Sequence, residues 1–389
     1  MIIGSLSWAF AQVRHYVDDL PCATIVAKGL VPQTIEICEG EGLAGANRVL
    51  AIDVGAGTQD ILLYESNKPI ENCVKMILPS QTSLVAGRIK RATAEGQDVF
   101  LTGNLMGGGP CVSAMKRHIR AGFSVYATPL AAKTIRDNPR EVEEIGVHIV
   151  EEVPTDAVSI ETRDVHLDSL QQALGLFDVE LPECYAIAVQ DHGETLEGSQ
   201  RRFRFQHWER FVEAGGHISS LAYREIPDYF TRMRAVRADV PGALLMDTGS
   251  AAIWGALCDP AVAAHQEEGL VIVNVGNQHT VGVLLRGERV WGLFEHHTVL
   301  LTAEKLAACV GALRRGTLSN DEVYDEHGHG AMIHADYPPD GSFEFVAVTG
   351  PKRHMAEDLG YYMAVPYGDM MLSGAFGLVA AGRRLGLVE

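Results

Sequence analysis

One pattern occurs twice in this chain, and it constrains the fold more than any other feature. Residues 50–64 read LAIDVGAGTQDILLY, and residues 271–285 read VIVNVGNQHTVGVLL. Each segment has an apolar run, then Asp53 or Asn274, then Val-Gly, a polar turn and a second apolar run. Two apolar runs joined by a glycine-containing turn predict a β-hairpin. The alternative is a chance match between two common hairpins, but this match includes a polar residue, a glycine and a threonine together.

The spacing of the two segments predicts a duplicated architecture. Asn274 stands 221 residues after Asp53, a period too long for a solenoid repeat but suited to two similar domains. The 389 residues are enough for two domains, and 47% hydrophobic and 21% charged residues are typical of a globular protein.

Strand-like and helix-like periodicities alternate along the chain, which predicts an α/β fold. We expect domain I at 48–265, completed by a helix within 368–389, and domain II at 266–367. Residues 1–47 are expected to form an N-terminal extension with a helix near 5–19. The expected strands are 49–54, 61–64, 74–78, 98–102, 185–189, 243–246, 271–275, 281–285 and 344–348. The expected helices are 82–95, 110–121, 128–136, 168–175, 206–213, 250–257, 302–314 and 368–385.

The net charge of the chain limits the classes of partner that it is suited to bind. Lys and Arg number 32 against 50 Asp and Glu, a net charge of −18. Such an acidic chain without a basic tract is poorly suited to nucleic acid or anionic membranes, so we expect small-molecule ligands. The apolar start is too short to span a bilayer, and the seven cysteines are dispersed without a Cys-x-x-Cys pair. We therefore expect a cytoplasmic protein, and a homo-oligomer stays open.

The repeated turns have the chemistry of a phosphate site. Gly55 and Gly57 lack Cβ atoms, so backbone N–H groups can approach phosphate oxygens, and Thr58 adds a hydroxyl. Asp53, at the end of the strand, can hold Mg²⁺. A second turn with Gly276, Asn277 and Thr280 would hold the other side of a polyphosphate.

These segments resemble the phosphate motifs of the actin, Hsp70 and sugar-kinase superfamily of ATP-binding proteins. DVGAGTQD at 53–60 resembles the first phosphate motif, NVGNQHT at 274–280 the second, and FVAVTGPK at 345–352 the adenosine motif. The resemblance spans about residues 48–389 and implies two ribonuclease H-like domains around a cleft, the actin-like ATPase fold, with ATP and Mg²⁺ as cofactors. It implies nucleotide contacts at Asp53, Gly55, Gly57, Thr58, Asn274, Gly276, Asn277, Thr280, Thr349 and Gly350.

Within that superfamily the chain is most similar to an uncharacterised family labelled as a pyruvate formate-lyase activating enzyme. A glycyl-radical activase of that kind needs a Cys-x3-Cys-x2-Cys cluster. The sequence contains no such cluster. The label therefore disagrees with the residues, whereas the nucleotide motifs agree with them.

Two aspartates are candidates for a catalytic base. Asp191 follows an apolar strand, where a carboxylate can accept a proton from a hydroxyl or a water. Asp247, in Met-Asp-Thr-Gly, is the second candidate. For both the alternative is a capping or loop role, since Asp247 immediately precedes an expected helix.

A second glycine-rich segment, Gly107-Gly108-Gly109-Pro110, follows a strand and opens a helix. Free backbone N–H groups at such a helix start attract anions, and Lys116, Arg117 and Arg120 follow. The segment is expected to bind an anionic substrate, the alternative being a turn before a surface helix.

Histidines concentrate in the second half of the chain, often beside acids. Asp191-His192, Glu295-His296-His297 and the segment containing His327 and His329 could contribute to a metal site, although a solvated polar loop is favoured. The run Arg201–Phe205 alternates as an edge strand does, with a phosphorylated substrate as its other interpretation.

Three functions remain open. The favoured one is an ATP-dependent phosphotransferase or ATPase acting on a small anionic substrate, with Asp53 at the metal and Asp191 as base. The second is a nucleotide-gated binding protein or activase with slow turnover, favoured by Asn274, where many members of the superfamily carry Asp. The third is a His/Asp metal-dependent enzyme without nucleotide.

Overall fold

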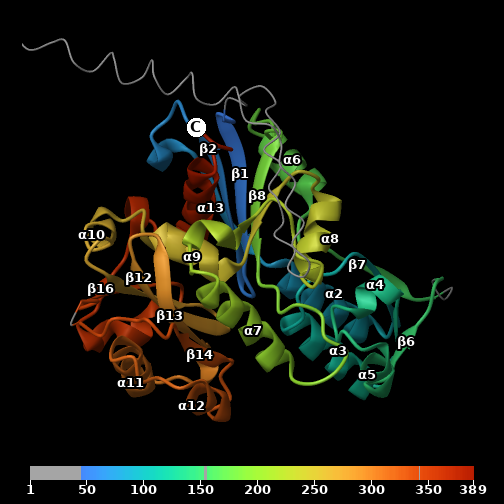
Figure 1. Ribbon diagram of the computed structural model, residues 1–389. Helices are drawn as coiled ribbons and strands as arrows, with labels where there is room; N and C mark the ends of the chain where they lie inside the picture. Colours follow the sequence, from blue (N-terminus) through green and yellow to red (C-terminus); the bar gives the residue numbers. More distant parts are fainter. Residues whose placement is uncertain (1–44, 153–155, 341) are drawn as a thin grey trace, which may run out of the picture. The chain divides into compact units, whose positions relative to one another are not determined.

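A computed structural model describes residues 45–152, 156–340 and 342–389 of the chain (Figure 1). Contacts divide the chain into Met1–Leu43 and Ala44–Glu389, and only the second unit contains described residues. The expected extension 1–47 lies outside the described residues except for 45–47, and the helix expected near 5–19 lies outside them entirely.

The first sheet contains the first copy of the repeated pattern. Its strand order is β3-β2-β1-β8-β10-β9, with β1 to β3 antiparallel and β1, β8 and β10 parallel. The pairing of Ile52 with Ile61 and of Asp53 with Asp60 confirms the predicted hairpin. The strands are β1 (Arg48–Val54), β2 (Thr58–Glu65), β3 (Val74–Pro79), β8 (Cys184–Val189), β9 (Ala222–Tyr223) and β10 (Leu244–Met246).

The second sheet repeats this topology. Its order is β14-β13-β12-β11-β15-β16, and the strands from β13 to β16 in this order match those from β3 to β10 of the first sheet as an antiparallel meander followed by parallel strands. Each sheet adds one antiparallel edge strand of its own, β9 in the first and β14 in the second. Asp53 and Asn274 are both the next-to-last residue of the first strand of their sheet. The strands are β11 (Leu270–Val275), β12 (His279–Arg286), β13 (Arg289–His297), β14 (Gly330–Ile333), β15 (Phe345–Thr349) and β16 (Tyr362–Met363). Two sheets with this shared order are two ribonuclease H-like halves, the arrangement of the actin-like ATPase fold.

A third sheet is inserted between β3 and β8. All its paired strands are parallel, in the order β6-β5-β4-β7, and it has its own apolar cluster around Ile89, Leu101 and Met115. The strands are β4 (Val99–Gly103), β5 (Val125–Ala127), β6 (Val147–Ile149) and β7 (Val158–Thr162), and the helices are α2 (Gln81–Glu95), α3 (Pro110–Arg120), α4 (Pro129–Ala132) and α5 (Pro139–Glu144). The sequence pattern did not separate this insertion from the rest of domain I.

Helices of four to fourteen residues connect and cover the two main sheets. They are α6 (Leu167–Gly175), α7 (Gln200–Glu213), α8 (Thr231–Asp239), α9 (Thr248–Ala256), α10 (Pro260–Ala263), α11 (Ala303–Arg314), α12 (Asn320–Asp325) and α13 (Ser373–Arg384). Short 3-10 turns lie at Ile70–Asn72, Ile218–Leu221, Thr298–Leu300, Arg353–Leu359, Pro366–Gly368 and Met370–Leu372. Among the described residues, no helix is both long and apolar enough to cross a membrane.

The edge strand expected at Arg201–Phe205 is wrong. These residues lie in α7, where Phe205, Trp208 and Val212 are buried at helical spacing and the Ser199 side chain caps the first turn. The alternation over five residues belongs to the start of this amphipathic helix, whose period becomes apparent only with Trp208 and Val212.

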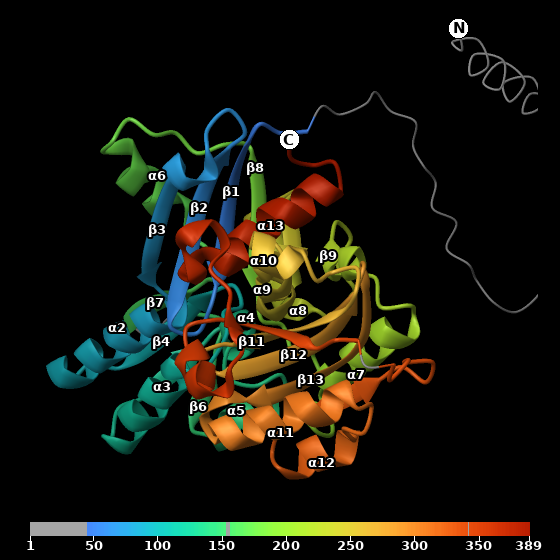
Figure 2. The ribbon, with the colours of Figure 1, turned by 90° about the vertical axis from the view of Figure 1, so that its left-hand side faces the viewer.

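Helices α9 and α13 lie against each other at the centre of the molecule (Figure 2). Helix α13 contacts β1, β2 and β8, whereas α9 contacts β11 and β15, so the pair lies between the two sheets. A Cβ atom at Gly255 would overlap the carbonyl oxygen of Ser373, and one at Gly377 would overlap that of Ala251. Glycines at these two positions therefore allow the backbones of α9 and α13 to pack closely.

Candidate functional site

A cavity of about 500 Å³ lies where the two main sheets and the inserted sheet meet. It collects most of the residues that the sequence singled out: Asp53, Gly55, Thr58, Gly107, Gly108, Gly109, Asp191, Asp247, Asn274, Gly276, Asn277 and Gly350. These positions come from segments up to about 300 residues apart in the sequence. The fold therefore brings the motifs to one place.

The two repeated turns have the same local geometry. The N–H of Gly55 donates to the carbonyl of Thr58, and the N–H of Gly276 donates to the carbonyl of His279, both at 2.9 Å. The turns also approach each other, because a Cβ atom at Gly57 would stand 2.8 Å from Nδ2 of Asn277. Glycine at position 57 thus keeps the two turns in close contact across the cavity.

Three of the predicted residues support the turns instead of lining the described cavity. Gly57 of the first turn packs against the side chain of Asn277 in the second turn. The hydroxyl of Thr280 lies 3.0 Å from that of Thr298, which donates to the carbonyl of Gly276. The hydroxyl of Thr349, fully buried, pairs with that of Ser373 at the start of α13.

Asp53 and Asp60 each have a buried carboxylate oxygen at the cavity without a hydrogen-bond partner among the described residues. In Asp53 this oxygen is Oδ1, and the backbone of Gly374 lies directly against Oδ2. Burial, with the carboxylates of Asp60 and Asp247 nearby, raises the pKa of Asp53 well above its usual range. Burial also raises the pKa of Asp60 to about 7. Burial and mutual repulsion therefore disfavour the charged forms of these two acids.

Asp191 is already held by the backbone. Its Oδ1 accepts from the N–H of Gly193 at 2.9 Å, and its Oδ2 accepts from the N–H of Met233 at 2.8 Å. Burial nevertheless raises the pKa of Asp191 to about 6, because these hydrogen bonds only partly offset the loss of solvent. Asp191 thus fixes the start of α8 at the cavity wall.

Asp247 is held in a similar way. As the N-cap of α9 its Oδ1 accepts from the N–H of Gly249, and both oxygens accept from Arg204, at 2.6 and 3.1 Å. The capping role proposed as the alternative for Asp247 is therefore present in the structure.

Arg204, which the sequence considered only within the run Arg201–Phe205, joins the two sheets. Its guanidinium donates to Asp247 and also to Glu295 of β13, 3.1 Å from Oε2. Glu295 accepts in addition from Nε1 of Trp208 at 2.9 Å. Burial alone would raise the pKa of Glu295, but Arg204 and the neighbouring histidines hold it well below its usual range. The signal that the sequence offers is the helical spacing of Arg204 with Trp208 and Val212, which places an arginine on the buried face of α7.

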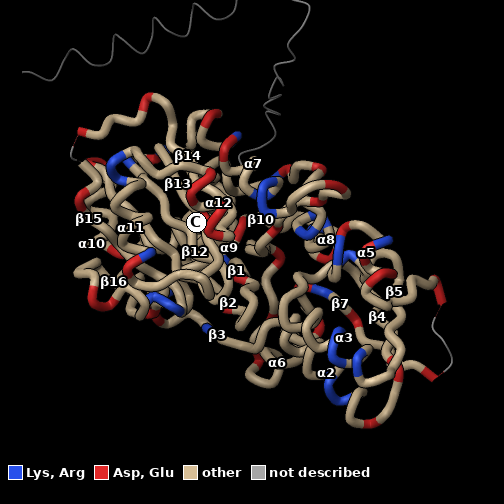
Figure 3. The backbone as a smooth tube through the Cα atoms, turned by 90° about the horizontal axis from the view of Figure 1, so that it is seen from below, with Lys and Arg blue, Asp and Glu red and all other residues tan. Residues whose placement is uncertain are grey.

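The glycine-rich segment 107–109 lies at the inserted-sheet end of the cavity. The hydroxyl of Thr82 donates to the carbonyl of Gly108, and the guanidinium of Arg232 packs against Gly107. Lys116, Arg117 and Arg120, which follow the segment in sequence, lie on α3 outside the described cavity lining, with other basic residues of α2 and α3 (Figure 3). The basic side chains at the cavity are instead Lys133, Arg136, Arg201, Arg204 and Arg232.

Gly350, in the segment that resembles the adenosine motif, touches the second turn. It adopts φ +97°, and a Cβ atom there would stand 2.5 Å from Oδ1 of Asn274. The N–H of Lys352 donates to the carbonyl of Val275 at 3.0 Å. The ends of β15 and β11 are therefore held in contact beside the cavity.

Histidines form another part of the wall. His192, His279 and His329 each place a ring nitrogen within 4.8 Å of the others, and His297 packs beside them. His327, which the His-x-His spacing suggested, instead sits in a turn at φ +68°. His296 points away, into contact with Gly328.

Comparisons with known structures give distant similarities. The chain is similar to the PPX-GPPA enzyme of Aquifex aeolicus at 12% identity, covering 78% of this chain and about two thirds (67%) of that one, with a TM-score of 0.28. It is similar to a ROK family glucokinase from Streptomyces griseus at 11% identity, covering 87% and 98%, with a TM-score of 0.30. It is also similar to the PilM-PilN type IV pilus biogenesis complex at 12% identity, covering 89% and 99%, with a TM-score of 0.31.

Among curated proteins, the comparison gave no match. One family model, described as "Putative pyruvate format-lyase activating enzyme (DUF1786)", matches residues 106–355, which is more than half of the chain. The matched span includes Gly107 to Gly109, Asp191, Asp247, the second turn and Gly350. The chain therefore belongs to the DUF1786 family.

Proposed function

We propose that the cavity binds Mg²⁺-ATP between the two turns and that the protein is an ATP-dependent phosphotransferase or ATPase acting on a small anionic substrate. The observation that carries the proposal is the facing pair of turns with matching closing hydrogen bonds, in contact at Gly57 and Asn277. Backbone N–H groups from both turns would then surround a polyphosphate placed between them.

The acids at the first turn fit a divalent cation. Asp53 brings a buried oxygen without a described partner close to Asp60, and carboxylate oxygens are what Mg²⁺ prefers. Asp53 would hold the ion, with Asp60 as a nearby negative charge. A bound Mg²⁺ would supply charge neutralisation for the phosphates. Asn274, the equivalent residue of the second turn, would contribute a neutral amide.

The base of the nucleoside would lie near Gly350. Pro351, Met370 and Met371 line the cavity next to this glycine and supply apolar surface for a ring. Thr349 would act indirectly, since its hydroxyl pairs with Ser373.

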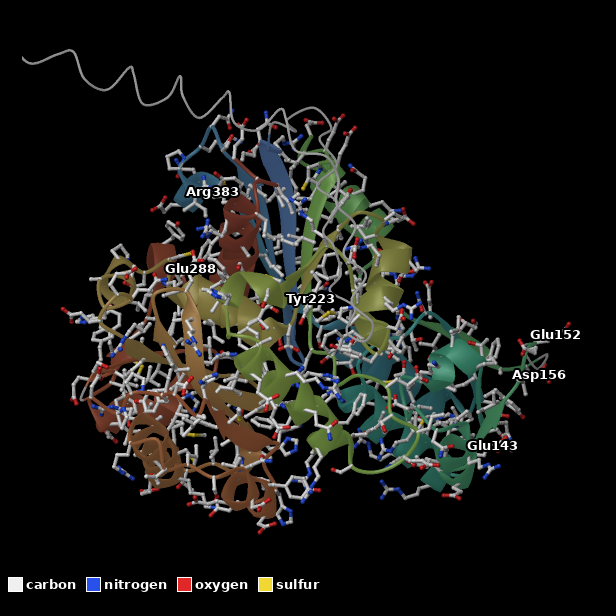
Figure 4. All side chains as sticks on the ribbon, viewed as in Figure 1. Glu143, Glu152, Asp156, Tyr223, Glu288 and Arg383 are labelled. Carbon is white, nitrogen blue, oxygen red and sulfur yellow. The ribbon has the colours of Figure 1, made fainter. Side chains whose placement is uncertain are left out.

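The other end of the cavity suits an anionic substrate. Gly107, Gly108 and Gly109 form its floor, and Lys133, Arg136, Arg201 and Arg232 line it in a chain whose net charge is −18. Other acidic side chains, such as Glu143, Glu152 and Asp156, lie at the outer edge of the insertion (Figure 4). Lys133, Arg136 and Arg232 are paired with Glu194, Glu141 and Asp164, whereas Arg201 donates to backbone carbonyls at Tyr324 and Gly328. Arg201 is therefore the cation at this end that would be available to a negatively charged group.

A second candidate is a nucleotide-gated binding protein or activase with slow turnover. The observation that favours it is that both oxygens of Asp191 accept backbone hydrogen bonds and that Asp247 is paired with Arg204. A carboxylate held in this way is a poor proton acceptor until those bonds rearrange. Glycyl-radical activation, which the family description suggests, is not proposed, because the sequence lacks the Cys-x3-Cys-x2-Cys ligands.

Calorimetric titration of the full chain with ADP and a non-hydrolysable ATP analogue, with and without Mg²⁺, tests the proposal. We expect one site per chain whose affinity depends strongly on Mg²⁺. Absence of binding at millimolar nucleotide would refute both nucleotide functions. Phosphate release by the wild type and by Asp191→Asn then separates them: measurable turnover that the substitution removes, with binding retained, indicates the enzyme.

A further inference from the structure

Four histidines converge at one end of the second sheet, although they are far apart in sequence. His279 begins β12 and pairs directly with His297 at the end of β13, and His329 immediately precedes β14. His192 comes from the other half of the protein, just after β8 of the first sheet. Three of these residues, His192, His279 and His329, form what we call the histidine cluster.

The ring nitrogens of the cluster lie close together, although farther apart than the ligands of a bound metal ion. One nitrogen from each ring lies within 4.8 Å of the other two. In a tetrahedral zinc site with bonds of about 2.05 Å, ligand nitrogens are about 3.3 Å apart. Modest side-chain rotations would bring the three nitrogens to that distance. All three residues also line the cavity, so a further coordination position would face it.

Glu295 fixes the protonation of His279. Its carboxylate accepts from Arg204 and Trp208 and lies 2.9 Å from Nδ1 of His279. Since a carboxylate paired with an arginine only accepts hydrogen bonds, Nδ1 of His279 must carry the proton. Its Nε2 then has a free lone pair. A carboxylate behind a histidine is the common support of a metal-binding imidazole.

His329 supplies an independent indication. Its ring is 1% exposed, and its Nδ1 is buried without a hydrogen-bond partner among the described residues. A buried polar atom left in this way costs free energy unless something binds it. Mutual stacking of the rings would explain their packing but would leave this nitrogen unsatisfied.

We propose that His192, His279 and His329 bind one divalent transition-metal ion of the zinc class, with a fourth position open to the cavity. Three imidazole ligands favour Zn²⁺, Co²⁺ or Ni²⁺ over Mg²⁺, which prefers oxygen. This site is distinct from the magnesium position at Asp53. Because His192 belongs to the first sheet and the other two ligands to the second, the ion joins the two walls of the cavity. The open position binds water or an oxygen of an anionic substrate.

The test is metal binding by the full chain, freed of metal with a chelator and titrated without nucleotide. Zn²⁺ is measured by competition with a chromophoric chelator, and Co²⁺ by its visible absorption, which is intense only for four- or five-coordinate ions. We expect one equivalent of metal. His192→Ala and His329→Ala should each weaken binding by at least about tenfold and remove the Co²⁺ bands. Zn²⁺ should also raise the thermal unfolding midpoint of the wild type but not that of His192→Ala.

His334→Ala is the matched control, because His334 lies just past β14 beside Trp291 and outside the cluster. It should bind metal as the wild type does. Asp53→Asn should also keep the Co²⁺ spectrum, so a failure of nucleotide binding leaves this test unaffected. Lack of stoichiometric binding by the wild type overturns the proposal. Wild-type affinity in both His192→Ala and His329→Ala, with a native circular dichroism spectrum, overturns it equally.

Discussion

Arg204 of α7 and Glu295 of β13 form an ion pair from which solvent is almost wholly excluded, with Nε and Oε2 3.1 Å apart. Because the same guanidinium also holds Asp247 after β10, it joins the two sheets. Arg204→Met would leave two buried carboxylates without their counter-charge. We expect it to lower the free energy of unfolding by about 3–5 kcal/mol in urea titrations.

The exposed pair of Arg384 and Glu288, 2.7 Å apart, is the control for that experiment. Arg384→Met should cost less than about 1 kcal/mol, because solvent screens both charges. A cost below about 1 kcal/mol for Arg204→Met as well would mean that the buried pair does not hold the sheets together.

Two helical glycines should respond in opposite directions to alanine. A Cβ atom at Gly255 of α9 would overlap the backbone of Ser373, so Gly255→Ala should destabilise the protein by about 2–4 kcal/mol. Gly87, exposed in α2, has no atom within 4 Å of the added Cβ. Gly87→Ala should stabilise by about 0.5–1 kcal/mol, since alanine is the better helix former. Equal effects in thermal unfolding would contradict the close α9–α13 packing.

Asp53→Asn should make the free protein more stable and should weaken its binding of nucleotide. It removes a carboxylate whose charged form is disfavoured by burial, Asp60 and Asp247. We therefore expect a higher thermal midpoint without ligands and a Mg²⁺-dependent nucleotide affinity lower by about tenfold or more. Asp358→Asn, at an exposed position in the 3-10 turn Arg353–Leu359, should change neither. A loss of stability together with unchanged affinity would argue against a cation at Asp53.

His207 predicts a dependence of stability on pH. It stacks on Tyr229 with ring centroids 4.3 Å apart, and burial lowers its pKa to about 4. Because the folded pKa lies below the unfolded value of about 6.5, the unfolded chain binds more protons between these values. Stability is therefore complete above about pH 6.5 and decreases as the pH falls towards 4.

Replacing the imidazole of His207 with a ring that does not titrate should remove its contribution to the pH dependence of stability. At pH 5 the loss is about 1 kcal/mol, after about half of the linkage energy is discounted for the partial exposure of His207. His207→Phe keeps the stacking and should flatten the stability profile between pH 4 and 6.5, measured by urea titration at several pH values. An unchanged profile would assign the acid sensitivity to other groups.

The parts of the structure that the sequence predicts are those encoded by short contiguous patterns. The hairpins around Gly55 and Gly276 are set by an apolar strand, a glycine turn and a second strand, and both were found. Of the inserted sheet the sequence predicted β4, at 98–102, but missed β5 and β6, because Val125–Ala127 and Val147–Ile149 have only three residues each, too few to show a periodicity.

The candidate site was predicted where a motif carries it and missed where distant contacts decide it. Asp191 was correctly expected at the cavity, but its hydrogen bond from Met233 comes from 42 residues away. His329 meets His192 and His279 only through the pairing of β12 to β14 and the approach of β8. The local spacing named His327 together with His329, but His327 lies in a turn outside the cluster.

Asp53 and Asn274 occupy equivalent positions, and the difference between them bears on the orientation of a bound phosphate chain. A site with acids on both sides would accept a linear polyanion in either orientation, since its two ends would meet the same charge. Here one half offers a carboxylate and the other a neutral amide. The duplicated halves are therefore alike in backbone but unlike in charge, and we expect a bound phosphate chain to have a single polarity, with its metal-bearing end at Asp53.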